Sequence, residues 1–468
     1  MLHATEDTNF AELRALLPES ETIDPSSPIY QKESVCWSAQ QDLHPKLILR
    51  PTCLSSLQGI VKHLYASTFD FAIRSGGVGS SSSCDILLSM TAFDSLTFDP
   101  SSETVTVGAG QTWGDLDAKL SESAPGYAVV GARCPFVGVA GAMLTGCISW
   151  LSHEYGLGSS PQNLLDVQIV LHDGRLLWAS EEPQLLWALR GGGGNLGVVA
   201  AFKLKAYRYT QSILSGIIKF PSSSKETLEA VSRRLAVFLR RCEDPKIACH
   251  VFIRNPSSPF LPGLGLLVFD ANGPEHGRGE DGFKWALDIE GAVDMTRECT
   301  IKDVNGYSGG ARAKMGRTSN WMTGTLVKNE QVDEAFLIRA NDWCDSIIRE
   351  DEGLAGGSFV LLECMQERAL QGEGVAWSKE GRRHVLQVGV GYKGLPKGEE
   401  ASKKAVKVLE ESTKRIIGDC EKGEYLPAFY QPEIMDARAL YAESFEKLKQ
   451  LKERYDPQGR FTGGISFT

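Results

Sequence analysis

The chain has 468 residues, of which 42% are hydrophobic and 23% charged, and its 49 basic and 59 acidic side chains give a net charge of −10. A chain of this length buries a core of ordinary size without disulfide or metal cross-links. The composition excludes a disordered, collagen-like or coiled-coil protein. The acidic balance argues against a nucleic-acid partner, because a phosphate backbone attracts basic surfaces.

The eleven cysteines are spread along the chain from Cys36 to Cys420 without a C-x-x-C pair. We read them as reduced thiols. The N-terminus lacks the basic and apolar regions of a secretory signal, and the proline in Asn255-Pro256-Ser257 blocks that glycosylation site. We therefore expect a cytoplasmic protein. The uncharged stretch 134–152 is as long as a membrane span, but its glycines, proline and hydroxyls favour a buried segment over a span.

The first two hundred residues predict short strands separated by glycine-rich turns, after a helix through Leu57, Val61 and Leu64. A second helix is expected at 113–120. The expected strands are 69–73, 86–88, 104–107, 167–171, 176–179 and 198–204.

The composition changes near Tyr207, where long amphipathic helices begin to alternate with strands. The last segment, 440–455, predicts a helix that ends at Asp456-Pro457. The fold class is therefore α+β. The expected strands of this region are 249–253, 264–269, 358–362 and 385–390, and the expected helices are 225–241, 330–350 and 399–417.

Two familiar motifs lack the structural context that their chemistry needs. Residues 192–197 match G-x-G-x-x-G, but a helical segment precedes them and a strand follows, which inverts the order of a dinucleotide-binding turn. Residues 306–310 match G-x-S-x-G around Ser308, but the preceding residues are too polar for the buried strand of a nucleophile elbow. A serine hydrolase acting through Ser308 is therefore a remote alternative. The histidines show no metal-ligand spacing, so no metal site is expected.

Four glycine-rich turns follow one another at 74–80, 107–113, 131–141 and 191–199. Backbone N–H groups of such a turn form a concave nest for a phosphate, and Arg74 can neutralise the phosphate charge. A single turn of this kind is usually only a turn, but four in this order are much more specific.

This set of turns resembles the FAD-binding domain of the PCMH-type flavoproteins of the vanillyl-alcohol oxidase superfamily. Within that group it is most similar to the berberine-bridge-enzyme-like oxidases of plants and fungi, and a fungal member is expected. The matching runs are 74–77, 108–110, 134–138, 150–157, 163–165 and 186–199, with 448–452 and 455–461 near the end.

The resemblance implies a two-part PCMH-type FAD-binding domain at 28–207 and a substrate domain at 208–425, in which helices back an antiparallel sheet. The tail, 426–468, would return to the FAD domain. By the same resemblance, the residues expected to bind FAD are Arg74, Ser75, Gly76, Gly77, Val78, Gly79, Cys134, Val137, Gly138, Gly141, Gly146, Gly156, Asn163, Gly197, Val198 and Val199.

The sequence departs from this family at positions that touch the cofactor. Val78 stands where the family usually has a histidine bonded to the flavin, so we expect non-covalent FAD. Cys134 stands where a subset of the family adds a second bond, and a thioether there is the alternative. Residues 140–149 replace several glycines of the family turn, and each added side chain crowds the backbone.

The resemblance implies a proton-abstracting side chain on the substrate sheet and hydride transfer to the flavin. The candidates are Glu363, Tyr392, His384 and Tyr430, each of which could equally be an ordinary sheet or surface residue. We expect an FAD-dependent oxidoreductase of secondary metabolism that acts on a hydrophobic small molecule, with O2 as the reoxidant. The alternative is a non-redox isomerase or cyclase of pericyclase type with structural or absent FAD. The oligomeric state is not indicated.

Overall fold

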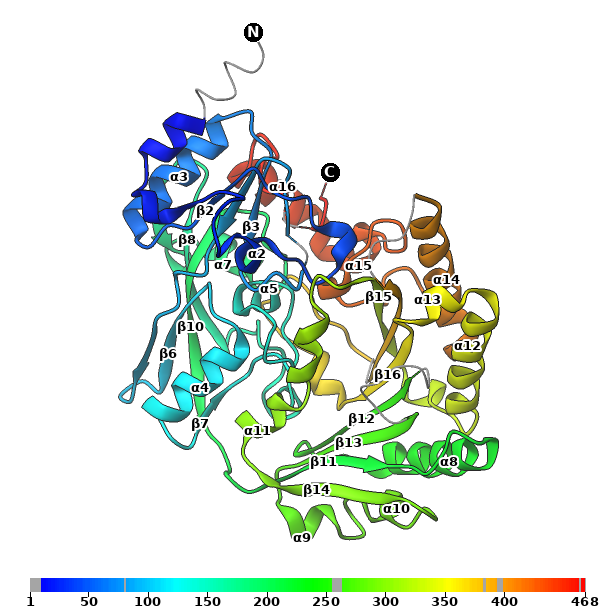
Figure 1. The fold of residues 1–468 in the computed structure, drawn as a ribbon. Coiled ribbons are helices and arrows are strands. Elements are labelled where there is room, and N and C mark those ends of the chain that lie inside the picture. The colour runs from blue at the N-terminus through cyan, green and yellow to red at the C-terminus, as the bar shows by residue number, and fades with distance from the viewer. Residues whose placement is uncertain are drawn as a thin grey trace.

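The computed structural model describes residues 10–79, 81–254, 263–381, 384–393, 399–462 and 464–467. Ser80, the last residue of the first turn, and the blocked site at 255–257 lie outside these ranges. The described chain forms three sheets, two in the first 210 residues and one in the middle of the chain (Figure 1).

The first sheet has four short strands and forms one flank of the molecule. Strands β2, β4 and β3 are parallel, and β1 is antiparallel to β2. Helix α3 (Leu54–Ala66) packs its apolar side on this sheet through Leu57, Ile60 and Leu64. In sheet order the strands are β1 (Thr22–Ile23), β2 (Leu47–Leu49), β4 (Ile86–Ser89) and β3 (Phe71–Arg74).

The second sheet has six antiparallel strands, and its long central strand β10 pairs with three others. In order the strands are β5 (Leu96–Asp99), β6 (Thr104–Gly108), β10 (Val198–Arg208), β8 (Leu164–Val170) and β9 (Leu176–Trp178), with β7 (Tyr127–Val129) beside β10. The helices of this part are α2 (Tyr30–Ser34), α4 (Trp113–Ser123), α5 (Val139–Leu144), α6 (Ser152–Tyr155) and α7 (Pro183–Leu189).

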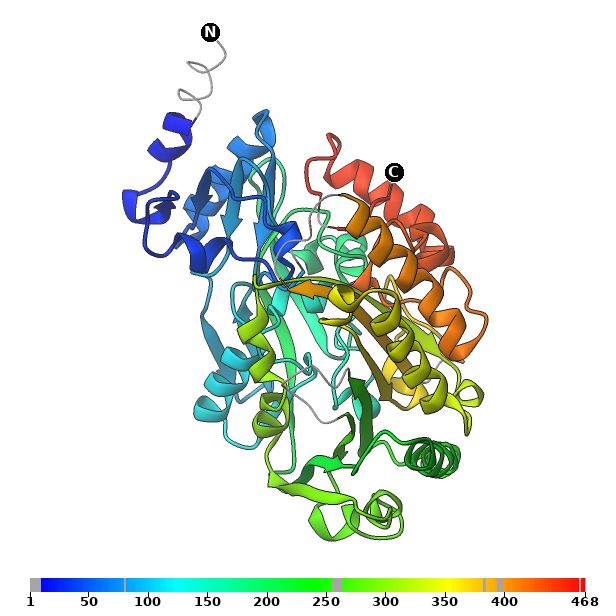
Figure 2. The ribbon, with the colours of Figure 1, turned by 45° about the vertical axis from the view of Figure 1, so that its right-hand side comes forward.

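The third sheet has seven antiparallel strands, and three long helices cover one of its faces (Figures 1 and 2). These helices are α8 (Lys225–Arg241), α12 (Phe336–Glu350) and α14 (Glu399–Ile417). In order the strands are β14 (Val293–Cys299), β11 (Ile213–Lys219), β13 (Leu264–Asp270), β12 (Ile247–Arg254), β16 (Phe359–Cys364), β17 (His384–Lys393) and β15 (Thr318–Val327).

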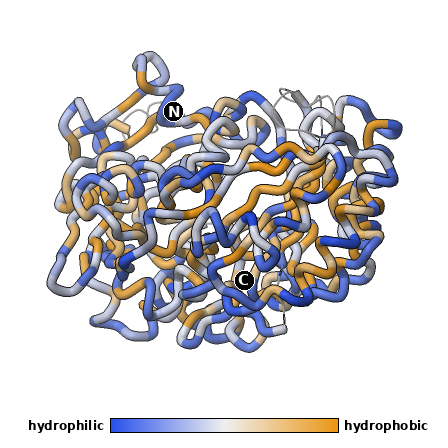
Figure 3. The backbone as a smooth tube through the Cα atoms, turned by 90° about the horizontal axis from the view of Figure 1, so that it is seen from below, coloured by the Kyte–Doolittle hydropathy of each residue, from blue (hydrophilic) through white to orange (hydrophobic). Residues whose placement is uncertain are grey.

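The two faces of this third sheet pack against different parts of the molecule. Val251, Leu362 and Leu386 point into the core under the three helices. Side chains that alternate with them point to the opposite face, because successive strand residues face opposite sides. There Val385 shares a core with the first part of the chain. Hydrophobic segments accordingly lie inside the molecule, between the more polar outer helices (Figure 3).

Shorter helical segments link the strands of the third sheet, and the chain then returns to its first part. Leu448 and Leu451 of α16 share a core with Leu189 of α7. The linking segments are α9 (Pro274–Gly277), α10 (Lys284–Leu287), α11 (Ile301–Gly306), η4 (Gly309–Lys314), α13 (Glu352–Ala355), η6 (Glu367–Leu370) and η7 (Pro427–Phe429), and the last helices are α15 (Ala437–Tyr441) and α16 (Phe445–Tyr455).

The predicted α+β class and the helix-backed antiparallel sheet are confirmed. Helices 225–241 and 399–417 match their predicted bounds. The single helix expected at 440–455 is wrong, because the chain breaks at Ala442, which has φ 45°. Strands β1, β5, β7, β11, β14 and β15 were not predicted. In the described residues, every helix is too short or too polar to cross a bilayer. The domain boundaries at 207 and 425 remain a proposal.

Candidate functional site

The first glycine turn directly follows β3 (Phe71–Arg74). Gly77 has φ 76°, a conformation that glycine adopts without strain. The turn is fixed by Trp37, whose N–H donates to the Gly77 carbonyl at 3.0 Å. Within the described part of the chain, no protein acceptor takes the N–H groups of Gly76, Gly77, Val78 or Gly79. These donors suit an anion, so the turn fits the pyrophosphate of FAD.

Arg74 is buried and lies against both helix α2 and the first glycine turn. Its Nη1 donates to the carbonyls of Ser34 at 3.2 Å and Val35 at 2.5 Å, and only 4% of the residue is exposed. A Cβ on Gly77 would lie 2.4 Å from the same guanidinium. Arg74 therefore holds helix α2 and the turn together through backbone contacts. A direct contact with phosphate remains a prediction.

The first turn lies against the second and third turns. A Cβ on Gly138 would lie 2.5 Å from the Gly76 nitrogen, so the two backbones touch where any larger residue would separate them. Ser75 donates its hydroxyl to the Ala109 carbonyl at 2.7 Å, which joins the first turn to the second.

The third turn also contacts the second and the fourth. Trp113 at the start of α4 donates its N–H to the Val137 carbonyl at 3.0 Å, and Gly193 donates to the Leu144 carbonyl at the end of α5 at 2.8 Å. Turns that are up to 120 residues apart in the sequence therefore form one surface made of backbone. Such a surface lets a cofactor approach closely, as an FAD-binding site requires.

The other predicted FAD-binding residues differ in what they contact. Gly141 is exposed, and a Cβ there would meet nothing within 4 Å, whereas a Cβ on Gly197 would lie 2.6 Å from the Val170 carbonyl. The side chain of Asn163 makes its hydrogen bonds within the protein. Its amide donates to two carbonyls, and its oxygen accepts from the hydroxyl of Tyr207 at 2.7 Å. Gly146 and Gly156 have positive φ, and Val198 and Val199 are buried in two adjoining cores.

Cys134 lies in the third turn, directly after Arg133. Ser308 donates its hydroxyl to the carbonyl of Arg133 at 3.4 Å and lies beside the Cys134 thiol. Burial raises the pKa of this thiol, which keeps it protonated at neutral pH. Helix α11 precedes Ser308 in place of the strand of a nucleophile elbow, so the structure does not favour a hydrolase.

Glu363 on β16 forms a buried ion pair with Arg133, the residue directly before Cys134. Arg133 also donates to the Ile148 carbonyl at 2.7 Å, and Gln387 on β17 donates to the other carboxylate oxygen of Glu363 at 2.8 Å. Only 2% of Glu363 is exposed. Burial raises the pKa of Glu363, and Arg133 partly offsets that rise. A carboxylate of raised pKa, held on both oxygens, is suited to accept a proton.

A buried histidine stands beside this carboxylate. His250 on β12 is the direct cross-strand neighbour of Glu363 and stacks on Trp150 with ring centroids 4.2 Å apart. Burial, reinforced by Arg133 and His153, holds the pKa of His250 well below its usual range. His250 is therefore neutral at neutral pH.

Two predicted catalytic residues lie on the other face of the sheet, under the helices. Tyr392 donates its hydroxyl to Asp351 at 2.9 Å, and Lys404 of α14 contacts the same carboxylate. His384 is fully buried; its Nδ1 accepts from the Met365 N–H at 3.1 Å and its Nε2 lies 3.1 Å from Asn329 Oδ1. These contacts give Tyr392 and His384 a structural role, and both lie on the face of the sheet that the helices cover.

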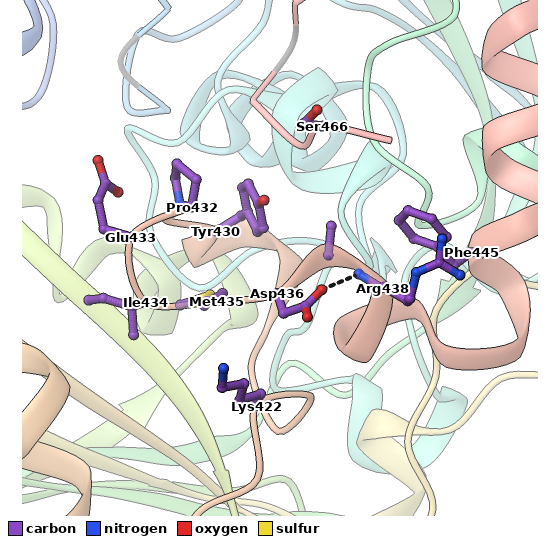
Figure 4. Close-up of a pocket in the computed structure, with 11 residues that line it drawn as sticks. Lys422, Tyr430, Pro432, Glu433, Ile434, Met435, Asp436, Arg438, Phe445 and Ser466 are labelled. Atoms are coloured by element: carbon purple, nitrogen blue, oxygen red, sulfur yellow. Dashed lines mark hydrogen bonds between the residues drawn. The ribbon is translucent and has the colours of Figure 1, made fainter. Parts of the chain in front are cut away.

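Tyr430 lines a cavity of about 450 Å³ formed by the last part of the chain (Figure 4). Its neighbours there include Met435, Asp436, Phe445 and Ser466, and none of the lining residues belongs to the third sheet. Asp436 accepts from the Arg438 N–H at 2.8 Å and thereby begins α15. Tyr430 and Glu363 therefore lie in different surroundings.

Three residues of the polar cluster were not predicted: Arg133, Gln387 and His250. Each carried a usable signal, since Gln387 and His250 are lone polar residues in apolar strands, and Arg133 directly precedes nineteen uncharged residues. A lone polar group in such a stretch needs a partner when it is buried.

Comparison with known proteins supports the cofactor assignment. Residues 45–180 match the family model described as FAD binding domain. An uncharacterized FAD-linked oxidoreductase of Arthroderma benhamiae is 30% identical over 55% of this chain and 52% of its own length, so the alignment spans about half of that relative.

Two solved structures share the fold over nearly the whole chain. The 6-hydroxy-D-nicotine oxidase of Arthrobacter nicotinovorans superposes with a TM-score of 0.78 at 21% identity, covering 97% of this chain and 98% of its own. A variant of berberine bridge enzyme gives a TM-score of 0.77 at 16% identity and covers 99% of both chains. At these identities the likeness shows the fold alone.

Proposed function

We propose that this chain is a berberine-bridge-enzyme-like FAD-linked oxidoreductase that oxidises a hydrophobic small molecule, with FAD as the acceptor and O2 as the reoxidant. One observation carries the proposal. The third glycine turn contacts the phosphate nest through Gly138 and the buried carboxylate of Glu363 through Arg133. A cofactor site and a proton acceptor therefore meet at one loop.

FAD supplies the hydride acceptor when it is bound. The N–H groups of Gly76–Gly79 would hold its pyrophosphate, and Glu363 would accept a proton from the substrate. Arg133 and Gln387 hold one carboxylate oxygen each, which fixes the orientation of Glu363. Such positioning keeps the reacting groups aligned without further reorganisation.

The proposed substrate is hydrophobic because two aromatic rings lie on the Glu363 face of the sheet. Phe359 lies over Gly389, where a Cβ would meet its ring at 2.2 Å, and Phe252 covers Gly265 in the same way at 2.6 Å. Phe252 lies opposite Leu361, two positions before Glu363 in β16, and Phe359 lies four positions before it, so both rings are on the Glu363 face. A flat apolar molecule suits such a surface.

A variant of Glu363 tests the assignment. Glu363→Gln keeps the shape of the side chain and its contact with Gln387 but removes the basic oxygen, so kcat should fall by roughly a hundredfold to ten-thousandfold. Flavin content should be unchanged. Glu373→Gln, at an exposed glutamate, is the matched control. Equal kcat in Glu363→Gln and the control would exclude Glu363 as the base.

We further propose that FAD is bound without a covalent bond, because Val78 offers no nucleophile and the raised pKa of the half-buried Cys134 keeps its thiol protonated. Acid precipitation should release yellow flavin into the supernatant. Colour that stays with the pellet in the parent protein but not in Cys134→Ser would instead establish a thioether.

Anaerobic turnover distinguishes redox catalysis from isomerisation. With candidate hydrophobic substrates, the visible flavin band should bleach, and turnover should stop after one equivalent until O2 is added. Sustained conversion to a product of unchanged mass, with the band untouched, would contradict the proposal and indicate an isomerase or cyclase.

A further inference from the structure

Two buried cysteines face each other across neighbouring strands of the third sheet. Cys249 on β12 and Cys364 on β16 are direct partners in the antiparallel register. Only 1% of Cys249 and 3% of Cys364 are exposed, and both lie in the core under the helices. Both are free thiols, paired across the two strands.

The register places the two side chains within reach of a covalent bond. Directly opposed residues of an antiparallel pair have Cβ atoms about 4.5–5.5 Å apart. A disulfide needs a Cβ separation of about 3.5–4.5 Å and a Cα separation below about 7 Å. The two strands therefore need to approach by about 1 Å or less at this position, which a hydrogen-bonded sheet can accommodate.

A small cavity lies directly beside the pair. Its volume is about 10 Å³, the space of about one water molecule, and Cys249 and Cys364 both line it. The half-buried Cys242, at the end of α8, lines the same cavity and connects it to a residue that solvent reaches. Gln366 closes another side and donates to the Cys242 carbonyl at 3.0 Å.

We propose that Cys249 and Cys364 are a peroxide-responsive pair that closes into a reversible disulfide. The proposed function enters only as the natural source of the oxidant, since electrons passed from a flavin to O2 yield hydrogen peroxide. The pair is built into the third sheet itself and needs neither cofactor nor substrate to react.

The chemistry balances with one peroxide for two thiols. One sulfur attacks a peroxide oxygen, the O–O bond breaks, and the thiol proton leaves with the departing hydroxide as water, which gives a sulfenic acid. The second sulfur attacks the sulfenic sulfur, the S–O bond breaks, and a second water leaves. Both sulfurs are oxidised by one electron each, and the peroxide is reduced to two waters.

The location of the pair links it to the candidate site. Cys364 directly follows Glu363 in β16, and Cys249 directly precedes His250 in β12. The thiols point to the helix side of the sheet, and the acid–base residues point to the other side. Closing the disulfide would lock β12 to β16 at the position that carries Glu363.

The test is a peptide map of the purified holoenzyme after treatment with hydrogen peroxide. Alkylation followed by non-reducing digestion should yield one linked peptide pair containing residues 249 and 364, and dithiothreitol should abolish it. Two of the eleven thiols should escape alkylation. Because the neighbouring Cys364 thiol and burial raise the pKa of Cys249, closure should be slow at neutral pH and faster toward pH 9.

Variants assign the linkage. Cys249→Ser and Cys364→Ser should each eliminate the linked peptides, whereas Cys344→Ser, at a buried cysteine of α12 in the same core, should leave them. The oxidised parent should unfold at a higher urea concentration than the reduced one, because the bond closes a long loop. Residues 249 and 364 that remain alkylatable after peroxide treatment, or a bond from either to Cys242, would overturn the proposal. Because hydrogen peroxide is added and need not be produced by the enzyme, formation of the disulfide can be measured even in a preparation without activity.

Discussion

Replacing Arg133 with alanine should leave the Glu363 carboxylate buried without its cation. The pair is well shielded from water, with 13% of the Arg133 side chain and 3% of the Glu363 side chain exposed. Removing one partner of a buried ion pair costs about 3–5 kcal/mol, because the remaining charge keeps its desolvation penalty. Gln387 still donates to Glu363 in the variant and cannot neutralise that charge.

The loss should depend on pH in a direction that the structure fixes. Burial already raises the pKa of Glu363 above its usual 4.5, and removing Arg133 raises it further. The folded state then binds the proton more tightly than the unfolded state. Stability contributed by the protonated carboxyl is complete below the ordinary glutamate pKa and is lost as pH rises through the folded pKa, by at most about 1.4 kcal/mol per pH unit.

Urea unfolding followed by tryptophan fluorescence at pH 5 and pH 8 measures this effect. Arg133→Ala should be much less stable than the parent at pH 8 and closer to it at pH 5. The double variant Arg133→Ala/Glu363→Gln should recover most of the loss at pH 8. Arg278→Ala, which breaks an exposed pair with Asp294, is the control and should cost about 1 kcal/mol or less. An equal loss at both pH values, or no recovery in the double variant, would refute the reasoning.

Three further changes test other parts of the molecule. Gly138→Ala forces a Cβ to within 2.5 Å of the Gly76 nitrogen and should lower the FAD content measured by absorbance. The control Gly59→Ala, whose added Cβ meets nothing within 4 Å, should retain its FAD. Equal FAD content in the two variants would mean that the first and third turns need not touch. Desolvation of Asp117 against α11 raises its pKa to about 7, so stability should fall as pH rises through 7, and Asp117→Asn should flatten that profile of thermal unfolding. Lys452 donates to the carbonyls of Asn195 at 3.0 Å and Phe461 at 2.6 Å, so Lys452→Met should make the tail more susceptible to limited proteolysis. An unchanged digestion pattern would show that the packing of α16 is enough to hold the tail in place.

The sequence determined what depends on neighbours along the chain. The amphipathic period of 225–241 and 399–417 predicted both helices with the bounds that the structure shows. One apolar side facing a core is visible in the spacing of the residues alone. The four glycine turns were likewise visible, since a tight turn after a strand needs glycine locally. Resemblance to a known family then supplied the cofactor and the candidate list, including Glu363.

Only the tertiary structure decided which of these candidates face the cofactor domain. Strand β17 is buried on both faces, so its sequence shows no alternation of polar and apolar residues. The sequence therefore does not tell whether Gln387 or His384 faces the first part of the chain. The partner of Glu363 was equally hidden, because Arg133 lies 230 residues away in the sequence. A side chain's face is fixed by the sheet that its strand joins, and an ion pair is fixed by which loops that sheet meets. Both are properties of the packed chain, and local sequence does not contain them.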